Sequence, residues 1–318
     1  MRRIKYPQRG TQEFDDIKDS YKAIFSAAEL SDMETDWADW KSRYGVTTIT
    51  ETVEDLLVAD VDVLSDVYDK FVNLGQVQER VPNGNGNLER SIEYKELDDI
   101  FRYYHHYDTR IAKFFRDHAE ELRICSCHYC ELAYVNTYQV VVGRKAMVHQ
   151  HFDVDHYLPK THCPILGLSL FNFVPSCQVC NSRIKSSGLI GANKADWVKY
   201  SPVSESYGFE DNVKIRLRMH RGPDTTFKKK GEYYIYFRCK NGFRVTVDFF
   251  HLEERYEFHK PEAMRIKQLK AKYPQSARRK IARLLGITEG RVREDLFHVH
   301  FLKDNNRCFA KLTNDMMK

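Results

Sequence analysis

Two short cysteine motifs, CHYC (Cys127–Cys130) and CQVC (Cys177–Cys180), frame the stretch that decides the fold, FDVDHYLPK (Phe152–Lys160). A Cys-x-x-Cys turn presents two thiolates from one tight turn, and two such turns supply the four soft ligands of a tetrahedral zinc site. The long segment between them is tolerated because the cost of loop closure grows only with the logarithm of loop length. We therefore predict one structural zinc ion, bound by Cys127, Cys130, Cys177 and Cys180.

The eight cysteines of the chain are too few and too clustered for a disulfide scaffold. Because zinc-binding thiolates persist in a reducing compartment, we expect a cytoplasmic protein. The other four are expected to be inert thiols: Cys125, Cys163, Cys239 and Cys308. The alternative to a zinc site is unpaired cysteines in two unrelated turns.

The charge of the chain is unevenly distributed. Residues 1–100 hold 12 Lys and Arg against 22 Asp and Glu, a net charge of −10. The chain totals of 50 basic and 45 acidic residues leave 38 and 23 for residues 101–318, a net charge of +15. We therefore expect a polyanion to bind the basic part, whereas the acidic N-terminal region is a candidate docking surface for a protein partner.

The composition, 42% hydrophobic and 13% aromatic, is that of a folded globular protein. MRRIKYPQRG (1–10) has no apolar run, so no secretory signal is expected. The longest uncharged stretch, residues 161–182, contains Pro164 and Pro175 and several polar groups that would lack partners in a bilayer. We therefore expect no membrane segment.

Hydrophobic spacing predicts helices within residues 11–74. Apolar residues recur there at intervals of three and four: Phe14, Ile17, Tyr21 and Phe25, then Leu56, Val63, Val67 and Phe71. The connector VPNGNGNLER (81–90) contains two Asn-Gly dipeptides and indicates a boundary. A further helical segment, residues 94–122, has these candidate core positions: Leu97, Ile100, Tyr104, Ile111 and Phe115.

Strand patterns follow. TYQVVVGRKAMVHQHFDV (137–154) predicts a hairpin that turns at Gly143 to Lys145. Residues 213–219, 232–239 and 243–249 predict a small antiparallel sheet, and the chain from Leu252 onward is basic and helical. We predict an α+β fold with three parts: an acidic helical region (1–90), a cysteine module with its lead-in helix (91–200), and a basic C-terminal region (201–318).

Between the cysteine motifs, Asp155-His156 is followed by Pro159, and Asn172 and Asn181 come later. This order of cysteine pair, Asp-His-x-x-Pro, Asn, cysteine pair and Asn resembles that of zinc-bearing members of the HNH endonuclease family. The resemblance covers a fifth of the chain and implies a ββα-metal module with a zinc clamp of four cysteines. The segment from Cys130 to Asp155 is longer than in compact members, which leaves the local hairpin geometry open. The overall layout bears a weaker resemblance to HNH nucleases of bacterial anti-phage and retron-associated systems.

The resemblance implies a hydrolase that cuts phosphodiester bonds in DNA, with double-stranded DNA as the expected substrate. His156 would be the general base, because histidine titrates near neutral pH, and Asp155 and Asn181 would hold Mg²⁺ or Mn²⁺. Asn172 would orient the His156 ring through its amide oxygen. Because consecutive strand residues face opposite ways, a bend or bulge is expected to bring Asp155 and His156 to one site.

Each of these residues also has a purely structural interpretation. His156 could be a core histidine, Asn172 could only bond backbone, and Asn181 could be a helix N-cap. Lys160, Arg183 and Lys185 either contact phosphates or are solvated. His149, His151 and Asp153 are expected to be solvated or to face substrate rather than to bind metal.

Two hypotheses remain open at this level. ARRKIARLLGITEGRVREDLF (277–297) is similar to a helix-turn-helix with Arg291 and Arg293 near the start of a recognition helix, although two packed amphipathic helices are favoured. For the whole chain, the alternative to a nuclease is a catalytically inactive, zinc-stabilised nucleic-acid-binding or scaffold protein. DNA against RNA, sequence specificity and oligomeric state are not determined by the sequence.

Overall fold

The computed structural model describes residues 2–101, 106–143, 145–220, 230–297 and 308–317 of a mixed α+β chain. The chain forms two compact units. One unit comprises residues 3–122 and 137–207, and the other comprises residues 1–2, 123–136 and 208–318. These units are not the three consecutive ranges expected from the sequence, because residues on both sides of the 81–90 connector belong to the first unit.

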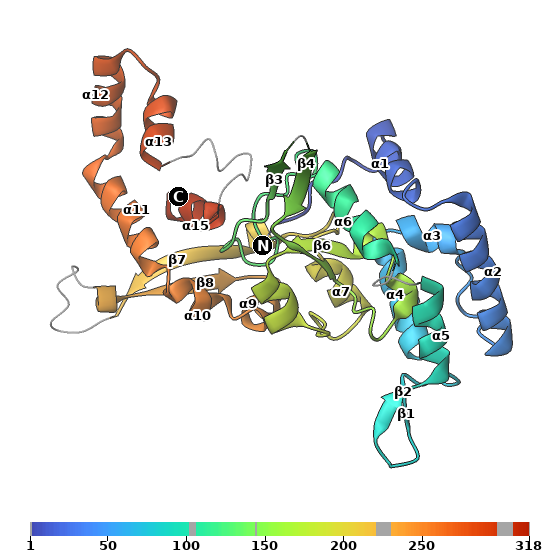
Figure 1. The fold of residues 1–318 in the computed structure, drawn as a ribbon. Coiled ribbons are helices and arrows are strands. Elements are labelled where there is room, and N and C mark those ends of the chain that lie inside the picture. The colour runs from blue at the N-terminus through green and yellow to red at the C-terminus, as the bar shows by residue number, and fades with distance from the viewer. Residues whose placement is uncertain (1, 102–105, 144, 221–229, 298–307, 318) are drawn as a thin grey trace. The chain divides into compact units, whose positions relative to one another are not determined.

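The first unit begins with four helices, α1 (Gln12–Lys22), α2 (Ala27–Arg43), α3 (Val53–Val58) and α4 (Val61–Val72), as predicted (Figure 1). Ser26 and Glu29 form a capping box that fixes the start of α2. Trp37 and Trp40 of α2 are fully buried and stack with ring centroids 5.5 Å apart. Val63, one of the apolar residues whose spacing predicts this helix, is 41% exposed, because the buried face of α4 passes through Val61, Leu64 and Val67.

The Asn-Gly connector forms a small hairpin, β1 (Arg80–Pro82) paired with β2 (Leu88–Arg90). Two helices follow, α5 (Ile92–Phe101) and α6 (Asp108–Asp117), and they confirm the helical prediction for this segment. Leu97, Ile100, Ile111 and Phe115 are buried as predicted, whereas Tyr104 lies outside the described residues.

Two antiparallel ribbons and a helical turn make up the rest of the first unit. The predicted hairpin is present as β3 (Thr137–Val142) and β4 (Lys145–Gln150). After it, β5 (Asp153–His156) pairs with β6 (Phe173–Ser176), and the loop between them contains the 3-10 turns η2 (Pro164–Leu166) and η3 (Leu170–Asn172). The π-helical turn η4 (Val179–Lys185) and helix α7 (Lys194–Tyr200) complete the unit.

The second unit is built on one two-stranded ribbon, β7 (Val213–Met219) with β8 (Tyr233–Cys239). Helix α8 (Phe209–Asn212) precedes β7, and the 3-10 turn η5 (Lys230–Glu232) precedes β8. Helices α9 (Arg244–Phe249), α10 (Leu252–Glu257), α11 (Lys260–Lys272), α12 (Gln275–Leu285), α13 (Glu289–Phe297) and α15 (Ala310–Met317) follow. The helical prediction from Leu252 onward is confirmed for the residues that the structure describes.

The prediction of a third strand at residues 243–249 is wrong, because this segment forms helix α9. Its buried residues are Phe243, Thr246, Val247 and Phe250, and this i, i+3, i+4, i+7 spacing belongs to a helix. The β-branched residues in RVTVDF favour a strand, but burial of this face makes the segment a helix.

Carboxylates protect both edges of the β7–β8 ribbon. Asp315 of α15 accepts a hydrogen bond from the Ile215 N–H at 2.8 Å. On the other strand, Glu253 and Glu257 of α10 accept from the N–H groups of Phe237 and Ile235, each at 2.8 Å. Glu253 and Glu257 therefore have a structural role at this edge of the ribbon.

Residues 277–297 form two helices that meet at Gly286, which has a φ of 64° at the end of α12. Arg293 is exposed, and Arg291 pairs with Asp295 at 3.3 Å. The helical pair is confirmed, and groove contact by α13 stays a prediction. Among the described residues, we find no helix that combines the length and apolar character required to cross a bilayer.

Candidate metal centre and active site

Each cysteine motif forms a tight turn held by backbone hydrogen bonds. In the first motif, Cys127 N–H donates to Ala133 O at 3.0 Å, and the Leu132 N–H donates to the Cys130 sulfur at 3.4 Å. In the second, the Asn181 N–H donates to Cys177 O at 3.0 Å. Amide groups that donate to a sulfur or tighten its turn fix the direction in which the thiol points.

The four predicted zinc ligands form one cluster. The sulfur atoms of Cys127, Cys130, Cys177 and Cys180 all lie within 4.8 Å of one another. Three of these side chains are buried and Cys177 is partly buried. Four thiols at this spacing fit a tetrahedral metal, and zinc is the metal that such a donor set favours in structural sites. The cluster can therefore hold a zinc ion.

Strand β5 and the turn η4 bring three of the four predicted catalytic residues to one pocket of ≈ 370 Å³. Its lining includes Asp155, His156, Lys160 and Asn181. The pairing of the two strands is continuous from Asp153 opposite Ser176 to His156 opposite Phe173, so β5 contains no bulge. The predicted bend is therefore absent within the strand. Asp155 and His156 reach the same pocket because His156 is the last residue of β5, where the chain leaves the strand.

The His156 ring is held from one side by a backbone carbonyl. Its Nε2 lies 2.9 Å from Gly167 O, and because a carbonyl only accepts, Nε2 carries the hydrogen and Nδ1 carries the lone pair. Burial lowers the pKa of His156 to about 3, although the Gly167 hydrogen bond acts in the opposite direction. The ring also packs against Phe173, with ring centroids 4.9 Å apart. His156 is therefore a fixed, neutral imidazole.

Asn172 does not perform the orienting role predicted for it. Its amide oxygen accepts from the Leu158 N–H at 2.7 Å, and its amide nitrogen donates to Leu158 O and Leu166 O at 3.0 Å each. Buried backbone groups of a loop need such partners, and Asn172 is buried itself. Asn172 thus fastens the loop between β5 and β6, and through Leu166 it holds the neighbouring Gly167 that contacts His156.

Lys185 is buried, which does not fit the predicted phosphate contact. Its ammonium lies 3.3 Å from both carboxylate oxygens of Asp155 and donates to His156 O at 2.6 Å. The Lys185 side chain is 0% exposed and that of Asp155 is 4% exposed. A charge removed from water needs an opposite charge close by, and Asp155 provides it. Lys185 is therefore a buried partner of Asp155 and is not among the residues that line the pocket.

Asn181 is held by an acidic residue that the sequence interpretation assigned elsewhere. Its amide nitrogen donates to Asp153 Oδ2 at 3.1 Å, so its amide oxygen is directed by this bond. Asn181 lies inside η4 and does not cap it, because Gln178 is at the N-cap. The spacing of Asp153 could have assigned it to the site, because residues 153 and 155 share one face of a strand.

The remaining flanking residues differ in position. Lys160 is partly buried at the pocket, and burial lowers its pKa to about 8. Arg183 is exposed. His151 is exposed, and His149 is exposed with its ring stacked on Tyr138 at a centroid distance of 5.3 Å. Lys160 is thus the cation of this group that lines the pocket.

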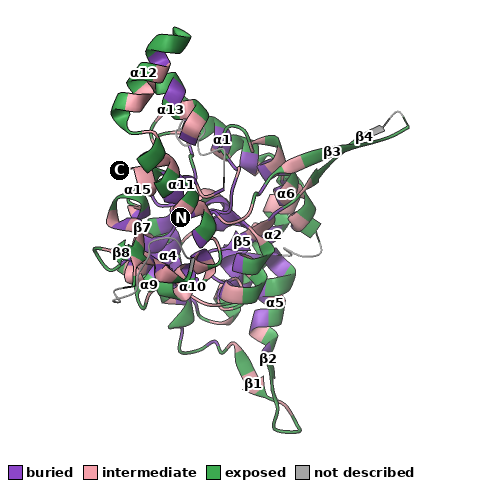
Figure 2. Ribbon diagram, turned by 90° about the vertical axis from the view of Figure 1, so that its left-hand side faces the viewer, coloured by how far each residue is buried: buried purple, intermediate pink, exposed green. Residues whose placement is uncertain are grey.

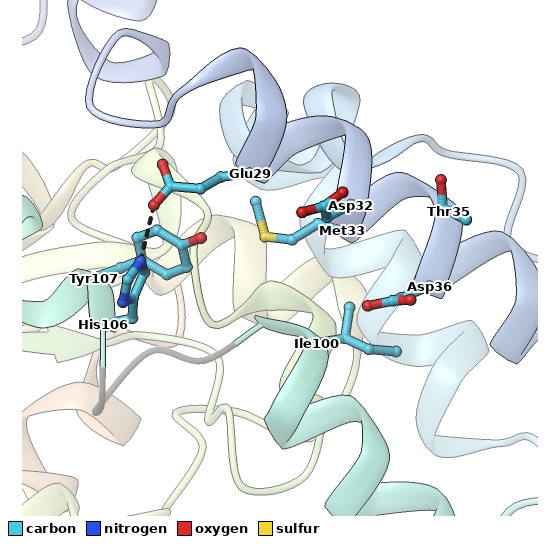
Figure 3. A pocket seen from close by; sticks show the side chains of 8 residues that line it. All are labelled: Glu29, Asp32, Met33, Thr35, Asp36, Ile100, His106 and Tyr107. Atoms are coloured by element: carbon cyan, nitrogen blue, oxygen red, sulfur yellow. Dashed lines mark hydrogen bonds and ion pairs between the residues drawn. The ribbon is translucent and has the colours of Figure 1, made fainter.

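A second pocket, of ≈ 280 Å³, lies beside α2 and is acidic (Figure 3). Glu29, Asp32 and Asp36 line it, together with His106 and Tyr107. Hydrogen bonds from Arg110 and from the Ser26 backbone hold the pKa of Glu29 well below its usual range, and His106 Nε2 lies 2.8 Å from its carboxylate. Three carboxylates repel phosphate, so this pocket does not suit a nucleic acid.

Comparisons of the chain with protein-family models, with curated proteins and with solved structures found no match.

Proposed function

We propose that this protein is a metal-dependent endonuclease of the HNH type that hydrolyses phosphodiester bonds in DNA. The observation that supports the proposal is the shared pocket of Asp155, His156 and Asn181. These residues supply a carboxylate, an imidazole and an amide, the groups required to bind a hard cation and to accept a proton. The resemblance of the Asp155-His156 segment to HNH nucleases points to the same reaction.

His156 acts as the general base in this proposal. With Nε2–H donated to Gly167 O, Nδ1 is the nitrogen that takes a proton from the attacking water. A base must be neutral before it acts, and the lowered pKa of His156 keeps the ring neutral in the substrate-free protein. The charge that forms on the ring during attack is compensated by the negative phosphate of the bound substrate.

The oxygen ligands of the proposed site are Asp155 and Asn181. A carboxylate offers about four lone-pair directions, so it can contact an ammonium such as that of Lys185 and a metal cation at the same time. Bound Mg²⁺ or Mn²⁺ would stabilise the charge that develops on the phosphate. Asp153 positions the Asn181 amide, and Lys160 attracts the phosphate from the pocket wall.

One observation favours the alternative, an inactive zinc-stabilised protein that binds nucleic acid. The buried ammonium of Lys185 already balances the charge of Asp155, which weakens the demand for a second cation. Under this alternative, the protein would retain DNA in a salt-sensitive manner and would not cut it.

The experiment compares wild type, His156→Ala and His162→Ala on supercoiled plasmid, single-stranded DNA and RNA, each with and without Mg²⁺ or Mn²⁺. His162 is a matched control because it lies in the loop that follows β5 and contacts Glu79 at 2.8 Å instead of lining the pocket. We expect metal-dependent nicking by wild type and His162→Ala, and a loss of roughly 10²–10⁴-fold for His156→Ala. Equal nicking by His156→Ala would contradict the assignment of the base, and no nicking by wild type would favour the alternative.

A further inference from the structure

The β3–β4 ribbon extends from the first unit with both of its faces exposed (Figure 2). Val141 is 66% exposed and Val148 is 52% exposed, and the strand register places them on one face. Val142 is 62% exposed and Met147 is 46% exposed, and they belong to the other face. Large apolar side chains gathered on an exposed surface mark a binding site more often than chance.

A ribbon of this kind gains little stability from its own residues. A two-stranded hairpin without a packed face is marginal in water. In the β7–β8 ribbon, by contrast, N–H groups at the strand edges donate to carboxylates of neighbouring helices. Such coverage is expected of a ribbon whose role is purely structural. The exposed β3–β4 ribbon therefore has features of an element that is completed by a ligand.

The charge of the ribbon indicates the chemistry of that ligand. No Asp or Glu occurs from Leu132 to Phe152, although the whole chain has 45 of them, and the same stretch of sequence includes Arg144 and Lys145. Two cations and no carboxylates make this stretch of sequence more favourable for a polyanion than for a basic partner. The side chains of Thr137 and Gln139 on β3 can form hydrogen bonds, and the valines offer apolar contacts.

The base of the ribbon is fixed to the strand that carries the candidate catalytic residues. Arg116 of α6 donates to Gln150 Oε1 at 3.1 Å, and the Gln150 amide donates to Phe152 O at 3.0 Å. Strand β5 begins at Asp153, directly after this anchor. The ribbon is therefore joined to Asp155 and His156 through only a few residues of the chain, and a ligand bound to the ribbon is held near them.

We propose that the β3–β4 ribbon enters the major groove of double-stranded DNA and holds the duplex next to the pocket. Strands of six residues span about 20 Å, and the major groove is about 12 Å wide and admits a two-stranded ribbon. Valine side chains then contact thymine methyl groups, and Gln139 faces base edges. The inference rests on the proposed function in one respect: the duplex bound by the ribbon is the substrate of that site.

The test measures binding separately from cleavage. Fluorescence anisotropy with a short labelled duplex in buffer without Mg²⁺ or Mn²⁺ reports affinity for wild type and for the double variant Val141→Glu/Val148→Glu. Added carboxylates oppose phosphates, so we expect the affinity of this variant to fall by about tenfold or more. The control, Val63→Glu/Leu88→Glu, adds the same charge at two exposed apolar positions of the same unit, on α4 and β2, and should bind as wild type. Circular dichroism verifies that both variants fold.

The outcomes distinguish the ribbon from the active site. Equal affinity of the two double variants, or no duplex binding by wild type, overturns the inference. Duplex RNA is the second ligand: its major groove is deep and narrow, so binding as tight as to DNA also overturns groove entry. If light scattering shows a wild-type dimer that the ribbon variant dissociates, with DNA affinity unchanged, the ribbon joins two copies instead. Ribbon-dependent binding without any cutting supports the inference and contradicts only the proposed nuclease activity.

Discussion

The ammonium of Lys185 lies 3.3 Å from each carboxylate oxygen of Asp155, and both side chains are almost completely buried. Lys185 also donates to the carbonyl of His156. One cation of η4 thus fixes the side chain of one candidate catalytic residue and the backbone of the next. The Asp155–Lys185 pair therefore contributes to the stability of the site as well as to its proposed chemistry.

Removing one partner of this pair should destabilise the protein strongly. Lys185→Met leaves the Asp155 charge buried and unbalanced, at a cost of about 3–5 kcal/mol in the free energy of unfolding. The double variant Asp155→Asn/Lys185→Met should recover part of this loss, because neither charge remains. Urea denaturation of the single and double variants measures both effects. Additive losses in the double variant would show that the two side chains are not coupled.

A methyl group at Gly167 should disturb His156, the proposed general base. A Cβ at this position would lie 2.9 Å from Pro164 O, closer than such atoms approach, so the backbone that holds His156 must shift. We expect Gly167→Ala to reduce plasmid nicking roughly 10- to 100-fold, as small misplacements of catalytic groups do. Gly75→Ala is the control, because a Cβ there meets no atom within 4 Å. Full nicking activity of Gly167→Ala would show that the position of Gly167 does not affect catalysis.

Loss of one clustered cysteine should remove the metal and unfold the module. For Cys180→Ser, we expect the zinc bound per chain to fall from near one to near zero, with loss of the cooperative thermal transition. Cys163→Ser is a suitable control, since Cys163 is also buried but lies outside the cluster. Metal analysis and circular dichroism measure the two quantities. A folded, zinc-bound Cys180→Ser protein would contradict the assignment of this ligand.

The affinity for DNA should depend on the charge of Lys160. Burial lowers the pKa of this ammonium to about 8, so it is charged below that pH and neutral above it. Binding to phosphate should therefore weaken as the pH rises from neutral through this value. Lys160→Arg keeps its charge throughout and should bind with little pH dependence. Anisotropy titrations of both proteins in buffer without Mg²⁺ or Mn²⁺ test this, and identical pH profiles would exclude Lys160 as the cause.

The sequence was sufficient for features that depend on local spacing. The cysteine motifs, the helices α1 to α4 and the β3–β4 hairpin follow from repeats of two to four residues, and the structure confirms each. The mistake at residues 243–249 has the same origin, because β-branched residues there suggested a strand while Phe243, Val247 and Phe250 were already spaced as one helical face.

The contacts inside the site could not be predicted, because they join residues that are far apart in the chain. Lys185 has the sequence context of a surface cation, and only tertiary packing places it on Asp155. In the same way, the choice between Asn172 and Gly167 as the partner of His156 depends on the path of the loop. Asp153 was recognisable by its alternation with Asp155, but its bond to Asn181 was not.

The π-helical turn η4 has a consequence for how the chain can vary in length. Asn181 and Lys185 both come from this turn, and its wide winding is marked by the bond from Ser186 N–H to Asn181 O at 2.7 Å. Deleting one residue between them would rotate Lys185 around the turn, away from Asp155. Insertions and deletions should therefore be tolerated in the β3–β4 turn and be excluded from residues 177–185 in any relative that keeps the site.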